Sequence, residues 1–245
     1  MSELLAEGFR RLFKEKRFYI VLAVIIAIPT FISIFIAIVE GRGSNIGDVL
    51  IFQMTGTIIM FISITAGMFI VNDFKNNTIR NKIIVGHPRS SIYFANLIIS
   101  LFVAVLYHLA YWLTLIGLGW PLLGFLKFPC SEIFINIGLT MVILVTYTCV
   151  IVFICNSLRT TGGVVLCIMM DTIVLLVAEL IVMFSKSKTV EKIAEIAIPS
   201  IQRQEFKYDP TSVPDKAAII IVIDIAICIV ATIGGILVFK KTDLK

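Results

Sequence analysis

Residues 73–96 read DFKNNTIRNKIIVGHPRSSIYFAN, the only long polar interruption in the very apolar first half of the chain. Asn76 or Asn77 can cap a helix here, because either side-chain oxygen can accept an unpaired backbone N–H at a helix start. Gly86 can take the left-handed conformation that ends a helix, and Pro88 prevents its continuation. The stretch therefore predicts a short helix between two turns.

This predicted helix, residues 78–85, is about two turns long. Ile79 and Ile83 share one of its faces, since residues four apart are neighbours on a helix, whereas Arg80 and Lys82 are directed elsewhere. We expect the chain to leave one apolar segment, form this helix and enter another apolar segment.

The apolar segments decide the class of protein. Of 245 residues, 59% are hydrophobic and 15% are charged, against roughly 25% charged in soluble domains. A spanning helix needs about 20 apolar residues to cross a hydrocarbon core of about 30 Å. No alternating pattern typical of a barrel recurs, so we predict an all-α integral membrane protein. One transmembrane domain covers residues 1–245, with six predicted spans at about residues 19–39, 49–71, 92–118, 133–155, 163–184 and 217–239.

The positive charges favour one orientation. A net charge of +5 would suggest a nucleic-acid partner in a soluble protein, but in a membrane protein the enrichment of cations in cytoplasmic loops explains it. Residues 186–216 carry six cations and disagree, although that segment is longer and also carries acids. Both termini are therefore predicted to be cytoplasmic, from the cations Arg10, Arg11, Lys14, Lys16, Arg17, Lys75, Arg80, Lys82, Arg89, Arg159, Lys240, Lys241 and Lys245.

The N-terminal residues 3–17 predict an amphipathic helix lying in the membrane interface. Cations beside an anionic leaflet contribute about 1 kcal/mol each, which marks Arg10, Arg11 and Lys14 as interface residues. Trp120 is assigned to the opposite interface, because indoles prefer that depth. The apolar stripe of the helix comprises Leu4, Leu5, Gly8, Phe9, Leu12 and Phe13.

Residues 185–216 are predicted to lie on the extracytoplasmic side and to contain a helix packed on the mouth of the bundle or dipping into it. Thr189 is its candidate cap, and Pro199 lies near its end. Residues 202–216 are expected to form an extended connection to the last span. The helix is indicated by apolar residues at helical spacing: Val190, Ile193, Ala194, Ala197, Ile198 and Ile201.

Three acids lie within predicted spans, Asp171, Glu179 and Asp224. Such groups usually face a bundle interior or a cavity, because an ionised carboxylate in the bilayer centre is costly. Asp171 and Glu179 are separated by about 12 Å along a helix and could line one side of a translocation path. Alternatively, an acid of this kind is protonated, lies near an interface or caps a neighbouring helix. For Asp224, near the start of its span, the two interpretations carry equal weight.

The sequence contains no motif for chemistry of its own. It has no G-x-x-x-x-G-K-[ST] phosphate loop, H-E-x-x-H pair or G-x-S-x-G elbow. Its five cysteines include no Cys-x-x-Cys pair that would indicate a zinc site. We therefore expect a chain that is not an enzyme by itself and binds no metal.

With these pieces placed, the chain resembles, over nearly its full length, the permease subunits of bacterial ATP-binding-cassette exporters of the type II class. Asn96 stands where that family often has lysine. The most specific resemblance is the family's acidic-x4-Thr-Ile-basic and Gly-x-x-Arg-x-x-Ile-aromatic pattern, matched by Asp73, Thr78, Ile79, Arg80, Gly86, Arg89, Ile92 and Tyr93.

In that family the segment is a coupling helix that docks in a groove of the ATPase subunit. The resemblance implies two permeases, identical or different, with two separate ATPases that bind ATP and Mg, in the bacterial cytoplasmic membrane. It also implies export of an amphipathic or antimicrobial peptide, and no cofactor on this chain. The expected ATPase contacts are Asn76, Asn77, Thr78, Ile79, Arg80, Lys82, Ile83 and Arg89.

Two other functions stay open at the level of the sequence. The first is a non-transporting membrane immunity or scaffold protein that binds its target directly. The second is an ion-coupled secondary carrier that uses the embedded acids.

Overall fold

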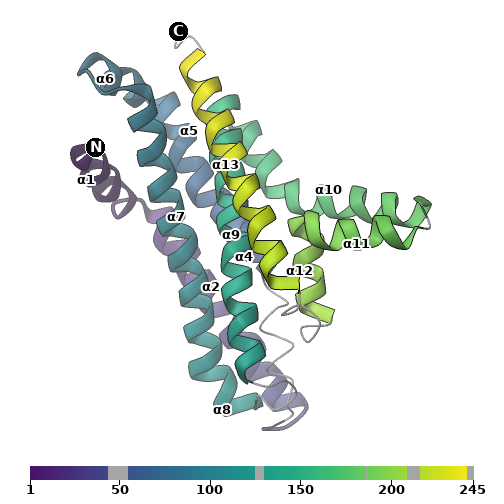
Figure 1. Ribbon diagram of the computed structural model, residues 1–245. Coiled ribbons are helices and arrows are strands. Elements are labelled where there is room, and N and C mark those ends of the chain that lie inside the picture. The colour runs from purple at the N-terminus through teal and green to yellow at the C-terminus, as the bar shows by residue number, and fades with distance from the viewer. Residues whose placement is uncertain (44–54, 125–129, 186, 209–215, 242–245) are drawn as a thin grey trace.

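The computed structural model describes residues 1–43, 55–124, 130–185, 187–208 and 216–241 (Figure 1). Within these ranges the chain is helical and contains no strand. Six helical stretches there are long and apolar enough to cross a membrane, which confirms an all-α protein with six candidate spans. The helices are α1 (Ser2–Leu12), α2 (Lys16–Val39), α4 (Thr55–Ile62), η1 (Ser63–Gly67), α5 (Met68–Lys75), α6 (Thr78–Ile84), α7 (Arg89–Thr114), η2 (Leu115–Gly119), α8 (Trp120–Leu123), α9 (Cys130–Leu158), α10 (Thr161–Ser185), α11 (Lys188–Ala197), α12 (Pro199–Tyr208) and α13 (Ala217–Lys241).

The candidate spans agree with the predicted ones to within a few residues at most ends. The third continues to Leu123, because the π-helical turn η2 carries the helix onward beyond Thr114. The second begins at Gly56, and residues 49–54 of its prediction lie outside the described residues.

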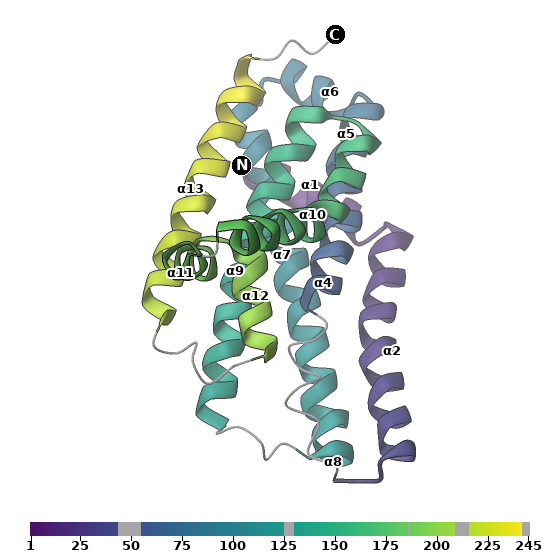
Figure 2. The ribbon, with the colours of Figure 1, turned by 90° about the vertical axis from the view of Figure 1, so that its right-hand side faces the viewer.

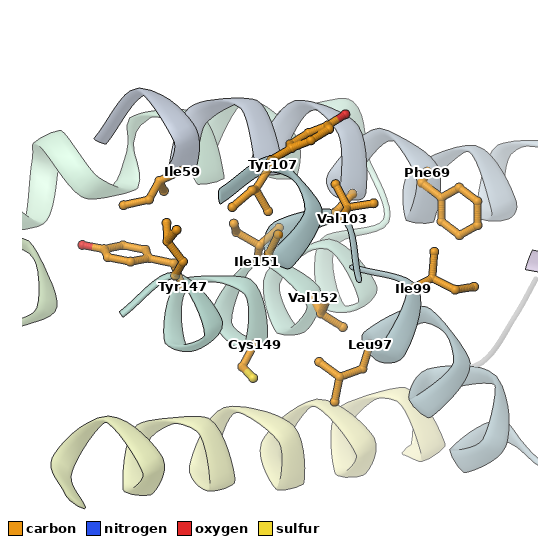
Figure 3. Close-up of a cluster of buried hydrophobic side chains, with 14 of the residues drawn as sticks. Ile59, Phe69, Leu97, Ile99, Val103, Tyr107, Tyr147, Cys149, Ile151 and Val152 are labelled. Atoms are coloured by element: carbon orange, nitrogen blue, oxygen red, sulfur yellow. The ribbon is translucent and has the colours of Figure 1, made fainter. Parts of the chain in front are cut away.

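Helices α7, α9 and α13 pack on one another. Helix α2 packs on α7, while α4 and α5 pack on α9 and α10 (Figure 2). Figure 3 shows the core that they share, where Ile59, Val103 and Tyr107 face Ile151 and Val152, all fully buried or nearly so. Close van der Waals packing of these side chains holds the helices together, because lipid tails are as apolar as the side chains and removing apolar area from lipid gives no driving force.

Tyr107 shows how the core accommodates a polar group. Its hydroxyl donates to the carbonyl oxygen of Phe18 at 3.1 Å and lies 3.0 Å from the hydroxyl of Thr65. The ring also stacks on the ring of Phe18, with centroids 5.9 Å apart. The buried hydroxyl is therefore satisfied while it ties α7 to α2 and η1.

Both termini, α6 and the turn between α9 and α10 lie at one end of the bundle, and α8 lies at the other (Figure 1). The cation-rich segments of the sequence therefore share one end, as their sorting predicted. Arg42 belongs to the opposite end, since the adjacent Gly43 donates its N–H to the carbonyl of Leu122 at 3.1 Å.

Helix α1 corrects the prediction of one amphipathic helix over residues 3–17. It ends at Leu12, and α2 already begins at Lys16. Leu4, Gly8 and Leu12 are buried, and α1 packs on α7. The apolar stripe at these positions therefore contacts protein, whereas the sequence predicted contact with lipid.

Residues 188–208 also differ from the prediction. Two helices meet at Ile198 in place of one helix and an extended connection, and Ser187, not Thr189, occupies the N-cap position of α11. The C-terminal part of α10 and α11 project sideways from the bundle (Figures 1 and 2). Helix α12 turns back and packs on α9 and α10. Residues 209–215 of the predicted connection lie outside the described residues.

Candidate functional site

The first candidate site is α6 with its two flanking turns. Asn77 precedes the helix in the left-handed conformation, with φ of 55°, and no side chain caps the helix start, so the predicted Asn76 or Asn77 cap is wrong. Gly86 has φ of 101°, which confirms the predicted left-handed turn after the helix. The backbone of the two turns, and not a side-chain cap, sets the ends of α6.

The inner face of α6 anchors it to the bundle. Ile79 is 1% exposed, and Ile83 is half-buried against the same core. These two predicted ATPase contacts thus pack inward, as their shared face indicated. Asn76, Asn77 and Arg80 are exposed, and Thr78 is partly exposed.

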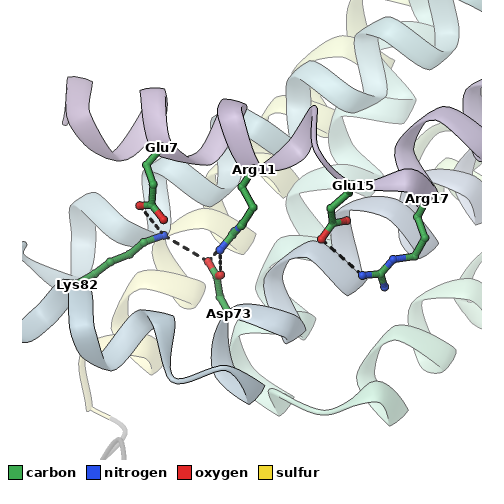
Figure 4. A network of polar contacts seen from close by, with 6 residues as sticks. All are labelled: Glu7, Arg11, Glu15, Arg17, Asp73 and Lys82. Carbon is green, nitrogen blue, oxygen red and sulfur yellow. Dashed lines mark hydrogen bonds and ion pairs between the residues drawn. The ribbon is translucent and has the colours of Figure 1, made fainter.

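Four charged residues join α1, α5 and α6 in what we call the ionic cluster: Glu7, Arg11, Asp73 and Lys82 (Figure 4). Arg11 donates two hydrogen bonds to the buried carboxylate of Asp73, one of them 2.9 Å long. The Nζ of Lys82 lies 3.5 Å from Asp73 Oδ2 and 3.3 Å from Glu7 Oε2. The pKa of Lys82 is lowered, mainly by burial and to a smaller extent by the nearby Arg11 cation.

The cluster changes the roles assigned to two cations. Lys82 points into the junction of three helices, whereas the sequence directed it away from the core. Arg11 lies 4.0 Å from the centroid of the Phe69 ring and pairs with Asp73, so it is not available as a simple membrane-interface cation. Arg10 and Lys14 are exposed, as that assignment requires, and Trp120 is 43% exposed at the opposite end.

Arg89 serves as a link between α7 and α13. It donates to the carbonyl oxygens of Phe239 and Lys240 at 3.2 and 2.9 Å, near the C-terminal end of α13. A cation is favourable at that position, because the last carbonyls of a helix lack backbone partners. This predicted ATPase contact therefore holds the end of the last candidate span.

The outer face of α6 contains two apolar residues of the expected coupling helix that were not among the individual ATPase contacts expected from the sequence. Ile84 is 73% exposed and Val85 is 76% exposed, directly beside the turn at Gly86. The signal was present in the unbroken apolar run of residues 83–85, which exceeds what one inward face can bury. A groove of about 310 Å³ lies between this face and α1, lined by Glu3, Leu4, Glu7, Thr78, Asn81, Lys82, Val85 and His87.

The second candidate site is a polar cluster buried between α9, α10 and α12. Asp171 is 7% exposed and accepts hydrogen bonds from Tyr147 at 2.7 Å and from Arg203 at 2.8 Å. Ser200 shares a hydrogen bond with the Tyr147 hydroxyl. Arg203 was missed, because its stretch has no periodic pattern and was expected to be extended. An arginine brought to a buried carboxylate by a helix supplies the charge balance that burial demands.

The other two embedded acids are not brought together with Asp171. Glu179 is exposed and lies beside a groove that also contains Glu191 and Glu195 of α11. Asp224 is fully buried on α13. Asp171 and Glu179, both on α10, therefore have different surroundings, since the first is buried and the second is exposed.

No protein-family model matches this chain, and no curated protein matches it. Among the described residues, no group of three or more His, Cys, Asp or Glu side chains is placed to hold a metal ion. The chemistry of the two sites is therefore argued from their own geometry.

Proposed function

We propose that this chain is the permease subunit of an ATP-driven exporter and that α6 docks on a separate ATPase subunit. The observation that carries the proposal is the exposed apolar pair Ile84 and Val85, beside the exposed Arg80, on a short helix whose inner face is firmly packed. An apolar tip with a neighbouring arginine has the composition of a protein–protein contact.

The links of α6 to the bundle suit a coupling role. Lys82 connects it to Asp73 of α5 and Glu7 of α1, while Arg89, just beyond the turn, holds the end of α13. A displacement of α6 would therefore be transmitted to three helices at once. ATP-driven closure of the ATPase subunits could in this way shift the bundle between two conformations.

The proposed assembly contains two permeases and two ATPases in the bacterial cytoplasmic membrane, with α6 and both termini in the cytoplasm. The sharing of one end by the cation-rich segments supports this orientation. ATP and Mg would be bound by the ATPase subunits. An amphipathic or antimicrobial peptide is the proposed substrate, carried by the bundle.

The test is capture of the partner by affinity-tagged full-length chain from its native membranes, with mass spectrometry of what is bound. Ile84→Asp and Arg80→Glu should each reduce recovery of a phosphate-loop ATPase at least tenfold while membrane insertion stays intact. Arg42→Glu is the matched control, because it makes the same charge change on the opposite end and should leave recovery unchanged. Undiminished recovery with both α6 variants would remove α6 from the interface.

A further inference from the structure

Asp224 is a buried carboxyl group with no hydrogen-bond or ion-pair partner among the described residues. Its side chain is fully buried on α13, and neither carboxyl oxygen has a hydrogen-bond partner among the described residues. The hydrogen bonds around it go elsewhere, since Thr146 donates to its backbone carbonyl at 3.5 Å and Cys228 donates to Thr146. Asp171 differs from Asp224 in this respect, because its carboxylate accepts hydrogen bonds from Arg203 and Tyr147.

The charged groups of the surrounding helices do not balance it. Arg203 of α12 is paired with Asp171, and Lys216 is paired with Glu195 of α11 at 2.7 Å. Among the described residues, three titratable groups of α7 and α9 face α13. Arg89 binds the C-terminal end of α13, far along the helix from Asp224, and Tyr93 and Cys149 are neutral at physiological pH. The remaining nearby cations, Lys188 and Lys192, line a groove beside Ile223, and no ion pair joins them to Asp224 among the described residues.

An ionised carboxylate in such a place is strongly disfavoured, because it has lost its hydration and gained neither a cation nor a donor. The neutral acid avoids this penalty by binding a proton. The amide of Gln202 on α12 is the polar neighbour of Asp224, and a hydrogen bond donated by this amide would favour the carboxylate. Its NH2 group donates instead to the carbonyl oxygen of Ile196 at 2.6 Å, and its buried Oε1 lacks a hydrogen-bond donor among the described residues. A neutral carboxyl group could supply one, whereas a carboxylate could not.

Helix α12 supplies a buried neighbour of this group. Gln202 is fully buried and donates to the carbonyl oxygen of Ile196 at 2.6 Å. Ile196 and Ile223 both line a groove of about 340 Å³ that opens between α11 and α13. Two neighbouring residues hold α12 in place. Ser200 forms a hydrogen bond with Tyr147, and Arg203 donates to Asp171. Withdrawal of α12 would bring water from the groove to the carboxyl group.

We infer that Asp224 is a proton-binding site closed by α12, occupied by a proton in this conformation and ionised when α12 withdraws. The site would couple proton release to a movement of α12 within the bundle. The inference does not depend on a partner ATPase, because it rests only on groups of this chain.

Infrared difference spectroscopy of the full chain in lipid nanodiscs tests the inference directly. The difference between wild type and Asp224→Asn at neutral pH should contain the C=O band of a protonated carboxyl group, shifted in heavy water. Loss of a carboxylate band in its place would show that Asp224 is ionised and would overturn the inference.

Asp73→Asn is the matched control, because it makes the same change at a buried acid that has an arginine partner but lies away from α12, and it should remove only carboxylate absorption. The wild-type protein provides a measurement free of folding defects. Its protonated-carboxyl band should be present at neutral pH and disappear on alkaline titration, and absence of any such band at neutral pH would equally refute the site.

The role of α12 is tested by combining Asp171→Asn, Arg203→Gln and Ser200→Ala, which removes both contacts that hold α12 without leaving a lone buried charge. The Asp224 band should then be lost at neutral pH, since water reaches the carboxyl group. A band as strong as in wild type would refute closure by α12.

Discussion

At the scale of single residues, one close approach decides how α7 meets α13. The buried ring of Tyr93 lies directly over Gly235, and a Cβ built there would lie 2.6 Å from the ring's Cζ atom. The adjacent Gly234 has room, since its added Cβ would lie 3.8 Å from Phe153. Of these two neighbouring glycines, only Gly235 is required by a close contact.

Gly235→Ala should destabilise the protein relative to Gly234→Ala by about 1–3 kcal/mol, because a rigid buried ring must move. Both variants gain the same helix propensity, about 1 kcal/mol, so their difference isolates the contact with Tyr93. Thermal unfolding of the two variants in the same detergent measures it, at about 2–4 °C per kcal/mol. Equal unfolding midpoints would show that Tyr93 does not pack on Gly235.

At the scale of elements, α12 depends on tertiary partners. Its sequence, PSIQRQEFKY, opens with a proline suited to a helix start but has no sustained apolar periodicity. Ser200 and Gln202 are nevertheless fully buried, and Arg203 approaches Gly56, where a Cβ would lie 3.1 Å from the guanidinium. Buried polar partners on other helices, not an apolar stripe, hold α12 against the bundle.

The Asp171–Arg203 pair should show strong coupling in a double-mutant cycle. Asp171→Asn or Arg203→Gln alone leaves one buried charge unpaired and should cost about 3–5 kcal/mol, whereas the double variant should cost less than the sum of the two by about 1–3 kcal/mol. Thermal unfolding of the four proteins gives the coupling energy.

The Glu195–Lys216 pair is the control for that cycle, since its side chains are 19% and 35% exposed. Exposed pairs couple by at most about 1 kcal/mol. Equal coupling energies in the two cycles would show that burial does not strengthen the interaction between Asp171 and Arg203.

At the scale of the whole molecule, the bundle has two chemically different ends. One end contains α1, α6 and the C-terminal end of α13, with their cations, and the other contains α8 and the turn at Arg42 (Figure 1). We predict that this asymmetry sets the orientation in a membrane, because cations near helix ends are retained on the cytoplasmic side.

Cysteine labelling of intact cells tests this orientation. Arg42→Cys should react with a membrane-impermeant maleimide from outside, and Val85→Cys should react only after permeabilisation. Both positions are exposed in the structure, so access to the side chain does not distinguish them. The unmodified protein gives the background of its native cysteines. Labelling of Val85→Cys in intact cells would place α6 outside.

The sequence alone determined the class of the protein, the six candidate spans, the extent of α6 and the gathering of cations at one end. Each of these follows from local composition, since about 20 apolar residues suffice for a span and a glycine suffices to end a helix. The inward face of Ile79 and Ile83 was likewise predictable from periodicity.

Only the tertiary structure decided which polar groups meet. It paired Arg11 with Asp73 and Arg203 with Asp171, directed the end of α10 away from the bundle and formed α12. It also left the Asp224 carboxyl group without a hydrogen-bond partner among the described residues. These outcomes depend on contacts between residues up to 62 positions apart. The physical reason is that a buried charge must be balanced by whatever group the fold brings to it, and no local pattern encodes that neighbour.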